Sequence, residues 1–156
     1  LNTGDGVGKN TGKIFKGIMK PNRDIKPFID IASRLGFDPK TKPVSCPQPG
    51  GYGGAMGPSQ FIPSTWISYE KIISSATGVI TPDPWIPRDA FFASSIYLSD
   101  LGAGKGEYNA EHTAAAKYYA GGRWAKLSGQ NYGSSVMEFA AEYQEQIDII
   151  NKMASR

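Results

Sequence analysis

Apolar residues recur at helical spacing in several stretches of this chain, and each stretch is bounded by residues that start or stop helices. In the segment 24–35, apolar side chains share one helical face, Asn22 or Asp24 can cap the start and Gly36 can end the helix. The segment 134–153 has an apolar stripe with charges opposite, which predicts a helix packed on the domain surface through one face. The spacing predicts helices over residues 24–35, 63–76, 87–101, 110–120 and 134–153.

Two of these helices have well-defined apolar positions. The pattern in 87–101 predicts a strongly buried helix, with inward positions at Phe91, Ser94, Ser95, Leu98 and Leu101. The stripe of 134–153 consists of Val136, Phe139, Ala140, Tyr143, Ile147 and Ile150.

The segments between these helices are rich in glycine and proline. Residues 1–12 are polar and glycine-rich and predict a loop, and residues 38–57 predict a long irregular connection. Connections of that length inside compact domains are uncommon and often functional. Alternation of apolar and polar residues is convincing only in 42–46. The chain is therefore expected to be one all-α domain over residues 1–156, with long irregular loops.

Composition and charge exclude several classes of protein. With 40% hydrophobic and 20% charged residues, the 156-residue chain is neither disordered nor fibrous. Its net charge of +3 is scattered singly, so we expect no nucleic-acid partner. Cys46, the only cysteine, is expected to be an inert loop thiol or to pair outside this segment. His112 is the only histidine and has no Cys, Asp or Glu cluster at metal-ligand spacing, so we expect no metal and no cofactor.

The segment 50–66, GGYGGAMGPSQFIPSTW, has the composition of a binding loop that leads into a helix. Glycines let a backbone approach a ligand closely, because no Cβ intervenes. Ser59 and Gln60 add neutral donors and acceptors, which suit a ligand rich in hydroxyl and amide groups better than a phosphate.

This segment closely resembles the signature GAMG-x-x-QF-x-P-S-x-W of the lytic murein transglycosylases, lysozyme-like helical enzymes that cut bacterial cell-wall glycan. Other parts of the chain resemble one branch of this family in the expected order. These parts are residues 22–28, 82–98, 115–124 and 132–136.

The resemblance implies an extracytoplasmic enzyme, in the periplasm or cell wall, that acts on peptidoglycan glycan strands. Such an enzyme cleaves the bond between N-acetylmuramic acid and N-acetylglucosamine and forms 1,6-anhydro-N-acetylmuramic acid. One Glu protonates the leaving oxygen and then takes the proton from the muramyl C6 hydroxyl, whose proximity supplies much of the rate. We expect a monomer, and no membrane anchor is visible in this segment.

The acid that carries this chemistry has no counterpart among the numbered residues. Family members hold it in a motif E-S-x-x-G-x-N-x-G, and ungapped alignment puts Gly4 at the Glu and Asp5 at the Ser. One alternative is that the Glu lies upstream of Leu1, so that the chain lacks the N-terminal acid-bearing helix. The other is that Gly4 replaces the acid and the chain is a non-catalytic glycan-binding module. Asp5 is a weak substitute, because Asp is shorter and its segment is a predicted loop.

The resemblance also implies a set of substrate-binding residues. Met56 would pack on a sugar face or an acetyl methyl group, with a place in the core as the alternative. Ser59 and Gln60 would form hydrogen bonds to the glycan, although Ser59 can also cap the following helix. Tyr119 fits a family tyrosine that reaches the cleft slightly better than Tyr118, and one of the two is expected in the core. The full set is Gly54, Ala55, Met56, Gly57, Ser59, Gln60, Tyr118 and Tyr119.

Four further aromatic residues lie near these segments. Phe61 and Trp66 are expected in the core, because they follow the loop at helical spacing. Trp85 and Trp124 flank loops and could stack on sugar rings, but such aromatics are also common at surfaces without a ligand.

Overall fold

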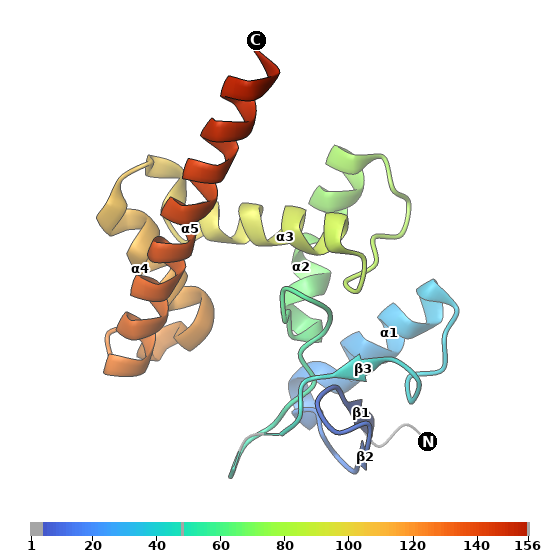
Figure 1. The fold of residues 1–156 in the computed structure, drawn as a ribbon. Coiled ribbons are helices and arrows are strands. Elements are labelled where there is room, and N and C mark those ends of the chain that lie inside the picture. The colour runs from blue at the N-terminus through green and yellow to red at the C-terminus, as the bar shows by residue number, and fades with distance from the viewer. Residues whose placement is uncertain (1–4, 48, 156) are drawn as a thin grey trace. The chain divides into compact units, whose positions relative to one another are not determined.

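A computed structural model of the chain describes residues 5–47 and 49–155 (Figure 1). Its contacts divide the chain into two compact units, Leu1–Ser94 and Ser95–Arg156, and the division falls inside helix α3, Pro87–Asp100. The described residues are mostly helical, as expected, but they include a small three-stranded sheet. The all-α expectation is therefore correct only for the greater part of the chain.

The sheet belongs to the first unit and has the order β2-β1-β3. Its strands are β1 (Gly6–Gly8), β2 (Ile14–Phe15) and β3 (Pro43–Val44). Strand β1 pairs antiparallel with β2, with Val7 opposite Ile14, and parallel with β3, with Val7 opposite Pro43.

The loop predicted for 1–12 is wrong at β1, and residues 1–4 lie outside the described part. Close packing explains the glycines of this strand. A Cβ on Gly6 would lie 2.9 Å from Cγ2 of Ile18, and one on Gly8 would lie 2.7 Å from Sγ of Cys46. Neither contact could be inferred from local propensity, because the neighbours come from elsewhere in the chain.

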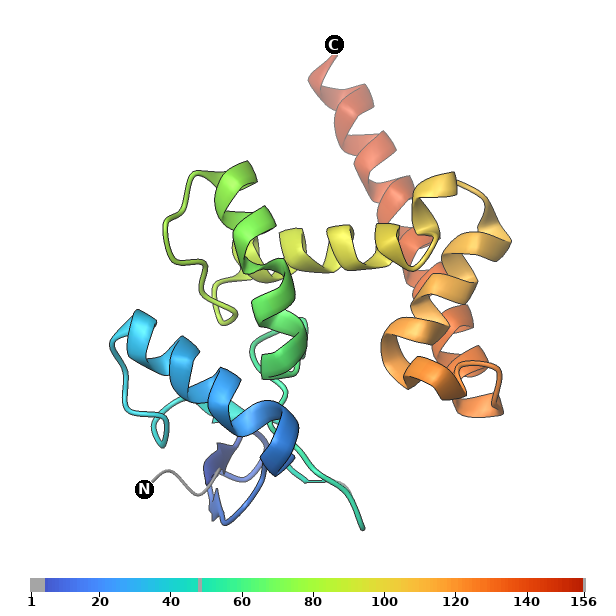
Figure 2. The same ribbon diagram turned by 180° about the vertical axis from the view of Figure 1, so that it is seen from behind.

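Two helices of the first unit begin and end close to their predicted bounds. Helix α1 is Lys26–Leu35, preceded by the π-helical turn η1, Pro21–Ile25, and helix α2 is Pro63–Thr77 (Figure 2). Gly36 ends α1 with φ 70°, and Gly78 ends α2 with φ 73°, both in the left-handed region that glycine tolerates. Pro63 takes the first position of α2, where its missing N–H costs no hydrogen bond.

Asp24 stabilises a different helix from the one that we predicted. It is fully buried, and α1 has no side-chain cap. Its Oδ1 accepts hydrogen bonds from the backbone N–H and the hydroxyl of Ser64, at 3.3 and 2.9 Å, in the first turn of α2. Arg23 donates to Oδ2 at 2.8 Å, so the buried carboxylate is paired as well as hydrogen-bonded.

The second unit contains the end of α3 and two longer helices joined by short 3-10 turns. Helix α4 is Tyr108–Ala120 and helix α5 is Leu127–Ala154, and the turns are η2 (Ala103–Lys105) and η3 (Gly121–Arg123). Helix α5 begins seven residues before the predicted start at 134. Gly129 and Gly133 of this extra part are buried, and Cβ atoms there would collide with backbone atoms of Trp124 and His112.

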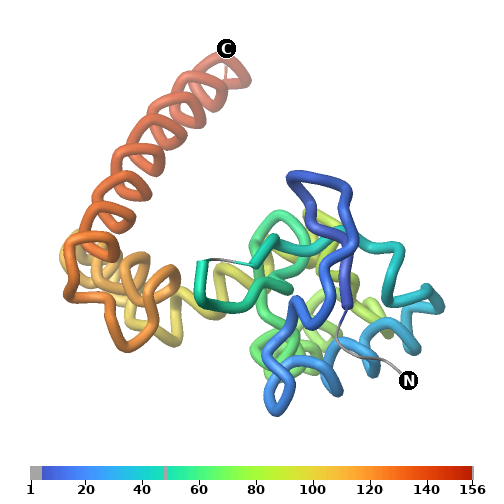
Figure 3. Tube along the Cα trace, turned by 90° about the horizontal axis from the view of Figure 1, so that it is seen from below, coloured from blue at the N-terminus to red at the C-terminus, as the bar shows by residue number. Residues whose placement is uncertain are grey.

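Two predicted apolar stripes are not buried. Phe91 of α3 is 60% exposed, whereas Ala90 and Ala93 are fully buried, so the buried face is made by small residues one position away. On α5, every residue of 138–154 is exposed, and Figure 3 shows this half of the helix extending beyond the other helices of its unit. Within the second unit, the predicted packing of this stripe is therefore absent from residue 138 onward, whereas Val136 is half-buried.

Candidate functional site

Ser45, just after β3, holds the glycine-rich loop by three hydrogen bonds. Its N–H donates to the Ala55 carbonyl at 2.8 Å, and its carbonyl accepts from the Gly54 N–H at 2.9 Å. Its hydroxyl accepts from the Ala55 N–H at 2.9 Å. The loop then closes on itself, because the Met56 N–H donates to the Phe61 carbonyl at 2.9 Å. Residues 54–61 therefore form an ordered platform before α2.

The glycines of this loop have partners within the protein. A Cβ on Gly53 or Gly57 would overlap the carbonyl oxygen of Ser45 or Pro84, respectively. A Cβ on Gly54 would lie 2.7 Å from Cγ of Met19, and Gly54 and Gly57 have φ of 93° and 61°. At these glycines the backbone lies close to other residues of the same chain. The glycine content alone is therefore no argument for a ligand.

The apolar residues of the loop lie in the core of the first unit. Phe61 and Trp66 are 4% and 0% exposed and their rings meet at 5.8 Å, which confirms the core placement expected for both. Met56 is also 0% exposed, so in this conformation its side chain offers no surface to a sugar. The structure places Met56 where its core alternative predicts.

The polar residues of the loop differ in what they offer to a ligand. Ser59 and Gln60 are half-buried as residues, but the hydroxyl oxygen of Ser59 is itself buried, so in this conformation it is not open to a glycan. Helix α2 has Ile62 as its N-cap, so Ser59 is not the cap of that helix. Gln60 has φ 55°, the one positive φ of a non-glycine residue among those described, and its Nε2 donates to the Gly57 carbonyl at 2.6 Å.

Two carboxylates of the first unit, Asp5 and Glu70, accept hydrogen bonds from other parts of the chain. Asp5 is half-buried, and its Oδ1 accepts a hydrogen bond from the Gly17 N–H at 3.0 Å. Glu70 of α2 accepts two hydrogen bonds from Nη2 of Arg34, at 2.8 and 2.6 Å. Gly4, the position aligned with the family acid, lies outside the described residues.

Tyr118 and Tyr119 belong to the second unit, at the end of α4. Tyr118 is half-buried with its ring 5.2 Å from that of Tyr97, whereas Tyr119 is 59% exposed. Tyr119 stacks on Tyr132 of α5 with ring centroids 4.7 Å apart and an interplanar angle of 10°. Tyr132 was not among the predicted site residues, although it begins one of the segments that resemble the family. Its pKa is raised above 10.0, first by burial and second by Tyr119.

Three other candidate residues have partners within the protein. The indole N–H of Trp85 donates to the Pro43 carbonyl at 2.9 Å, and its ring meets that of Phe37 at 5.3 Å. Trp124 lies under the Nζ of Lys117 at 5.5 Å. Nε2 of His112 is 3.2 Å from the hydroxyl of Ser134.

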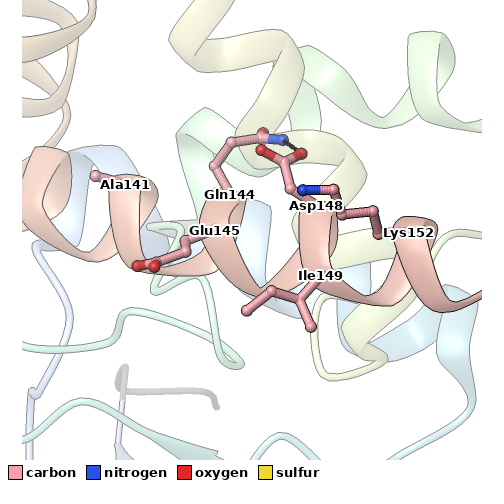
Figure 4. Close-up of a pocket in the computed structure, with 6 residues that line it drawn as sticks. All are labelled: Ala141, Gln144, Glu145, Asp148, Ile149 and Lys152. Carbon is pink, nitrogen blue, oxygen red and sulfur yellow. Dashed lines mark hydrogen bonds between the residues drawn. The ribbon is translucent and has the colours of Figure 1, made fainter.

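Two surface hollows are lined by residues outside the glycine-rich loop. One is lined by six residues of α5 alone, among them Glu145, Asp148 and Lys152, and Figure 4 shows it as an open strip along a single helix. Another lies beside the Arg34–Glu70 pair in the first unit. The described part of the chain contains no group of three or more His, Cys, Asp or Glu that could hold a metal ion.

Comparisons with protein-family models, with curated proteins and with solved structures give no match for this chain. No helix in the described ranges has the length and apolar character that crossing a membrane requires. The functional assignment therefore depends on the motif and on the local geometry of the loop.

Proposed function

We propose that this chain supplies the substrate-binding part of a peptidoglycan lytic transglycosylase. The order of motif residues 54–66 supports the proposal, and the structural observation that carries it is the left-handed backbone of Gln60. This residue lies in the motif, is half-buried and is held on an ordered loop. Its amide group is of the kind that binds the hydroxyl and acetamido groups of a glycan.

The strain at Gln60 favours a functional role over a purely structural one. A side chain in the left-handed region costs about 1 kcal/mol or more, and such residues gather at ligand clamps and active sites. Glycine would relieve this strain, as it does at Gly54 and Gly57 in the same loop. The donation from Nε2 to Gly57 fixes the amide, while the amide oxygen keeps capacity to accept a hydrogen bond from a glycan.

Catalysis in this proposal needs a carboxylic acid, and the loop segment 50–66 contains no Asp or Glu. A glutamic acid would protonate the glycosidic oxygen and then remove the proton from the C6 hydroxyl, so that an anhydro ring closes without water. Within this proposal it is the Glu of the family motif, and Asp5 stays a weak substitute because its carboxylate accepts from the Gly17 N–H. Because the Asp5 carboxylate already accepts this hydrogen bond, it also supports the second candidate, a glycan-binding module without catalysis.

Binding is tested by sedimenting the chain with insoluble peptidoglycan sacculi. Gln60→Gly removes the amide and relieves the positive φ, so the chain should remain folded while its affinity falls about tenfold, as expected for one hydrogen bond in a polar site. Gln60→Asn is the matched control, because Asn tolerates the left-handed region and keeps an amide. Equal retention of Gln60→Gly and the wild type would contradict the role of Gln60. Failure of the wild type to bind would count against both candidate functions.

Catalysis is tested by digesting sacculi and identifying the products by mass spectrometry. The protein as its gene encodes it should release 1,6-anhydro muropeptides. Binding without release would instead support the non-catalytic module. Reducing-end products alone would exclude the transglycosylase reaction.

A further inference from the structure

The C-terminal half of α5 is an exposed helix with an apolar stripe that nothing in the described part of its own unit covers. The first half of α5 approaches α4 at Gly133, beside His112, and Gly129 lies against the backbone of Trp124, but each residue of 138–154 is exposed. Isolated helices of this length are marginal in water, because most helical stability in proteins comes from packing an amphipathic face. A partner for the stripe would therefore stabilise this part of the helix.

Three positions of the stripe are followed by an apolar residue eleven positions later, whereas Ala140 is followed by Asn151. Val136, Phe139 and Tyr143 are followed eleven residues later by Ile147, Ile150 and Ala154. An eleven-residue repeat keeps apolar residues on one line along a helix and is typical of helices that pack along their length.

The stripe is also nearly symmetric about residue 145. Reversal of the helix about this point maps position 143 onto 147, 140 onto 150 and 136 onto 154. In an antiparallel pair, large and small side chains would face each other, such as Ile150 against Ala140 of the second copy. A parallel pair would instead place Ala140 against Ala140 and leave a gap. Self-complementarity of this kind is what an isologous two-fold interface requires.

Charges do not oppose such a pairing. At 100° per residue, the borders of the stripe carry the uncharged residues Gln144, Gln146 and Asn151. The charged residues Glu145, Asp148 and Lys152 lie together on the other side of the helix, along the strip in Figure 4, and Gln144 donates to Asp148 at 2.8 Å. Of the charged residues, Glu142 lies nearest the edge of the stripe.

The exposed apolar area is sufficient for a modest dimer. In the stripe, Phe139, Tyr143, Ile147 and Ile150 are 58%, 61%, 48% and 62% exposed, and Met153 at its border is 72% exposed. At the usual size of such side chains, this exposes roughly 600 Å² in each copy. If all of this area were covered, two copies would bury at most about 1,200 Å², the lower end of the range for specific protein–protein interfaces.

We infer that the α5 stripe is the dimer interface of this protein and that its occupant is the α5 stripe of a second copy, antiparallel about residue 145. This departs from the monomer expected from the sequence. The sequence also predicted that the stripe packs within its own domain, but residues 138–154 are exposed in the structure. The inference does not depend on the proposed function.

The mass of the chain in solution tests the inference. Sedimentation equilibrium should give twice 16.8 kDa for the wild type at high concentration. Ile150→Asp places a charge in the stripe and should weaken association by about 100-fold or more. Ile149→Asp is the matched control: Ile149 is 52% exposed on the other side of the same turn, so the same change should leave association within about twofold.

Disulfide trapping tests the orientation in a Cys46→Ser chain. Tyr143→Cys mixed with Ile147→Cys should form a mixed disulfide dimer faster than either variant alone. A wild type that stays monomeric at about 1 mM would overturn the inference, whether or not it binds lipid vesicles or another protein. Equal effects of the two Asp variants would overturn it too, as would trapping that favours each Tyr143→Cys chain with itself.

Discussion

The two units of this protein are packed in different ways. The fully buried apolar residues of the first unit include large side chains such as Trp66, Phe28 and Met56. In the described part of the second unit, the buried residues are small: Ala114, Ala115, Ala116, Gly129 and Gly133. The first unit thus gains stability by burying apolar volume, whereas the helices of the second approach closely and leave large side chains such as Tyr119, Phe139 and Ile150 exposed.

Removal of the largest core side chain should produce the largest effect in this comparison. Trp66 is 0% exposed and packs against Phe61, so Trp66→Ala should lower the free energy of unfolding by about 3–5 kcal/mol. Urea denaturation followed by circular dichroism measures the change. Tyr119→Ala, at a side chain 59% exposed in the second unit, is the control and should cost less than about 1 kcal/mol. Similar losses for both variants would contradict the difference between the units.

A single added methyl group should disturb the second unit. Although Ala favours a helix over Gly, a Cβ on Gly133 would lie 2.8 Å from the backbone oxygen of His112. Gly133→Ala should therefore lower the free energy of unfolding by about 1–3 kcal/mol, because overpacking forces the helices apart. Ser135→Ala, at an exposed position of the same helix, should be within about 0.5 kcal/mol of the wild type. A stabilising Gly133→Ala would show that α4 and α5 are not closely packed there.

The same difference explains which parts of the fold could be predicted from sequence. Helix ends marked by Pro63, Gly36 and Gly78 were predicted correctly, because their signals are local. Strand β1 was missed because its glycines are selected by contacts with distant residues. The early start of α5 was missed for a related reason: Gly129 and Gly133 break helices in general but here allow close packing.

The candidate site could be predicted in part. Its motif identified a loop that the structure shows to be ordered, but sequence could not tell which of its residues face outward. Met56 and the hydroxyl oxygen of Ser59 are buried, while Gln60 is half-buried. Nor could sequence reveal that Gln60 has a positive φ, since this depends on the closure of the loop between Gly57 and Phe61.

The smallest predicted effect concerns the stacked tyrosines at the surface of the second unit. Burial, and then Tyr119, raise the pKa of Tyr132 above 10.0 in the folded chain. The folded state therefore favours the protonated phenol, and this contribution to stability is fully present below pH 10.0 and is lost as pH rises through the folded pKa. Free energies of unfolding, measured between about pH 9 and 11, should fall less steeply for Tyr132→Phe than for the wild type. Because Tyr132 is 38% exposed, solvent screens the effect. A slope unchanged in Tyr132→Phe would mean that the burial of this phenol beside Tyr119 does not persist in solution.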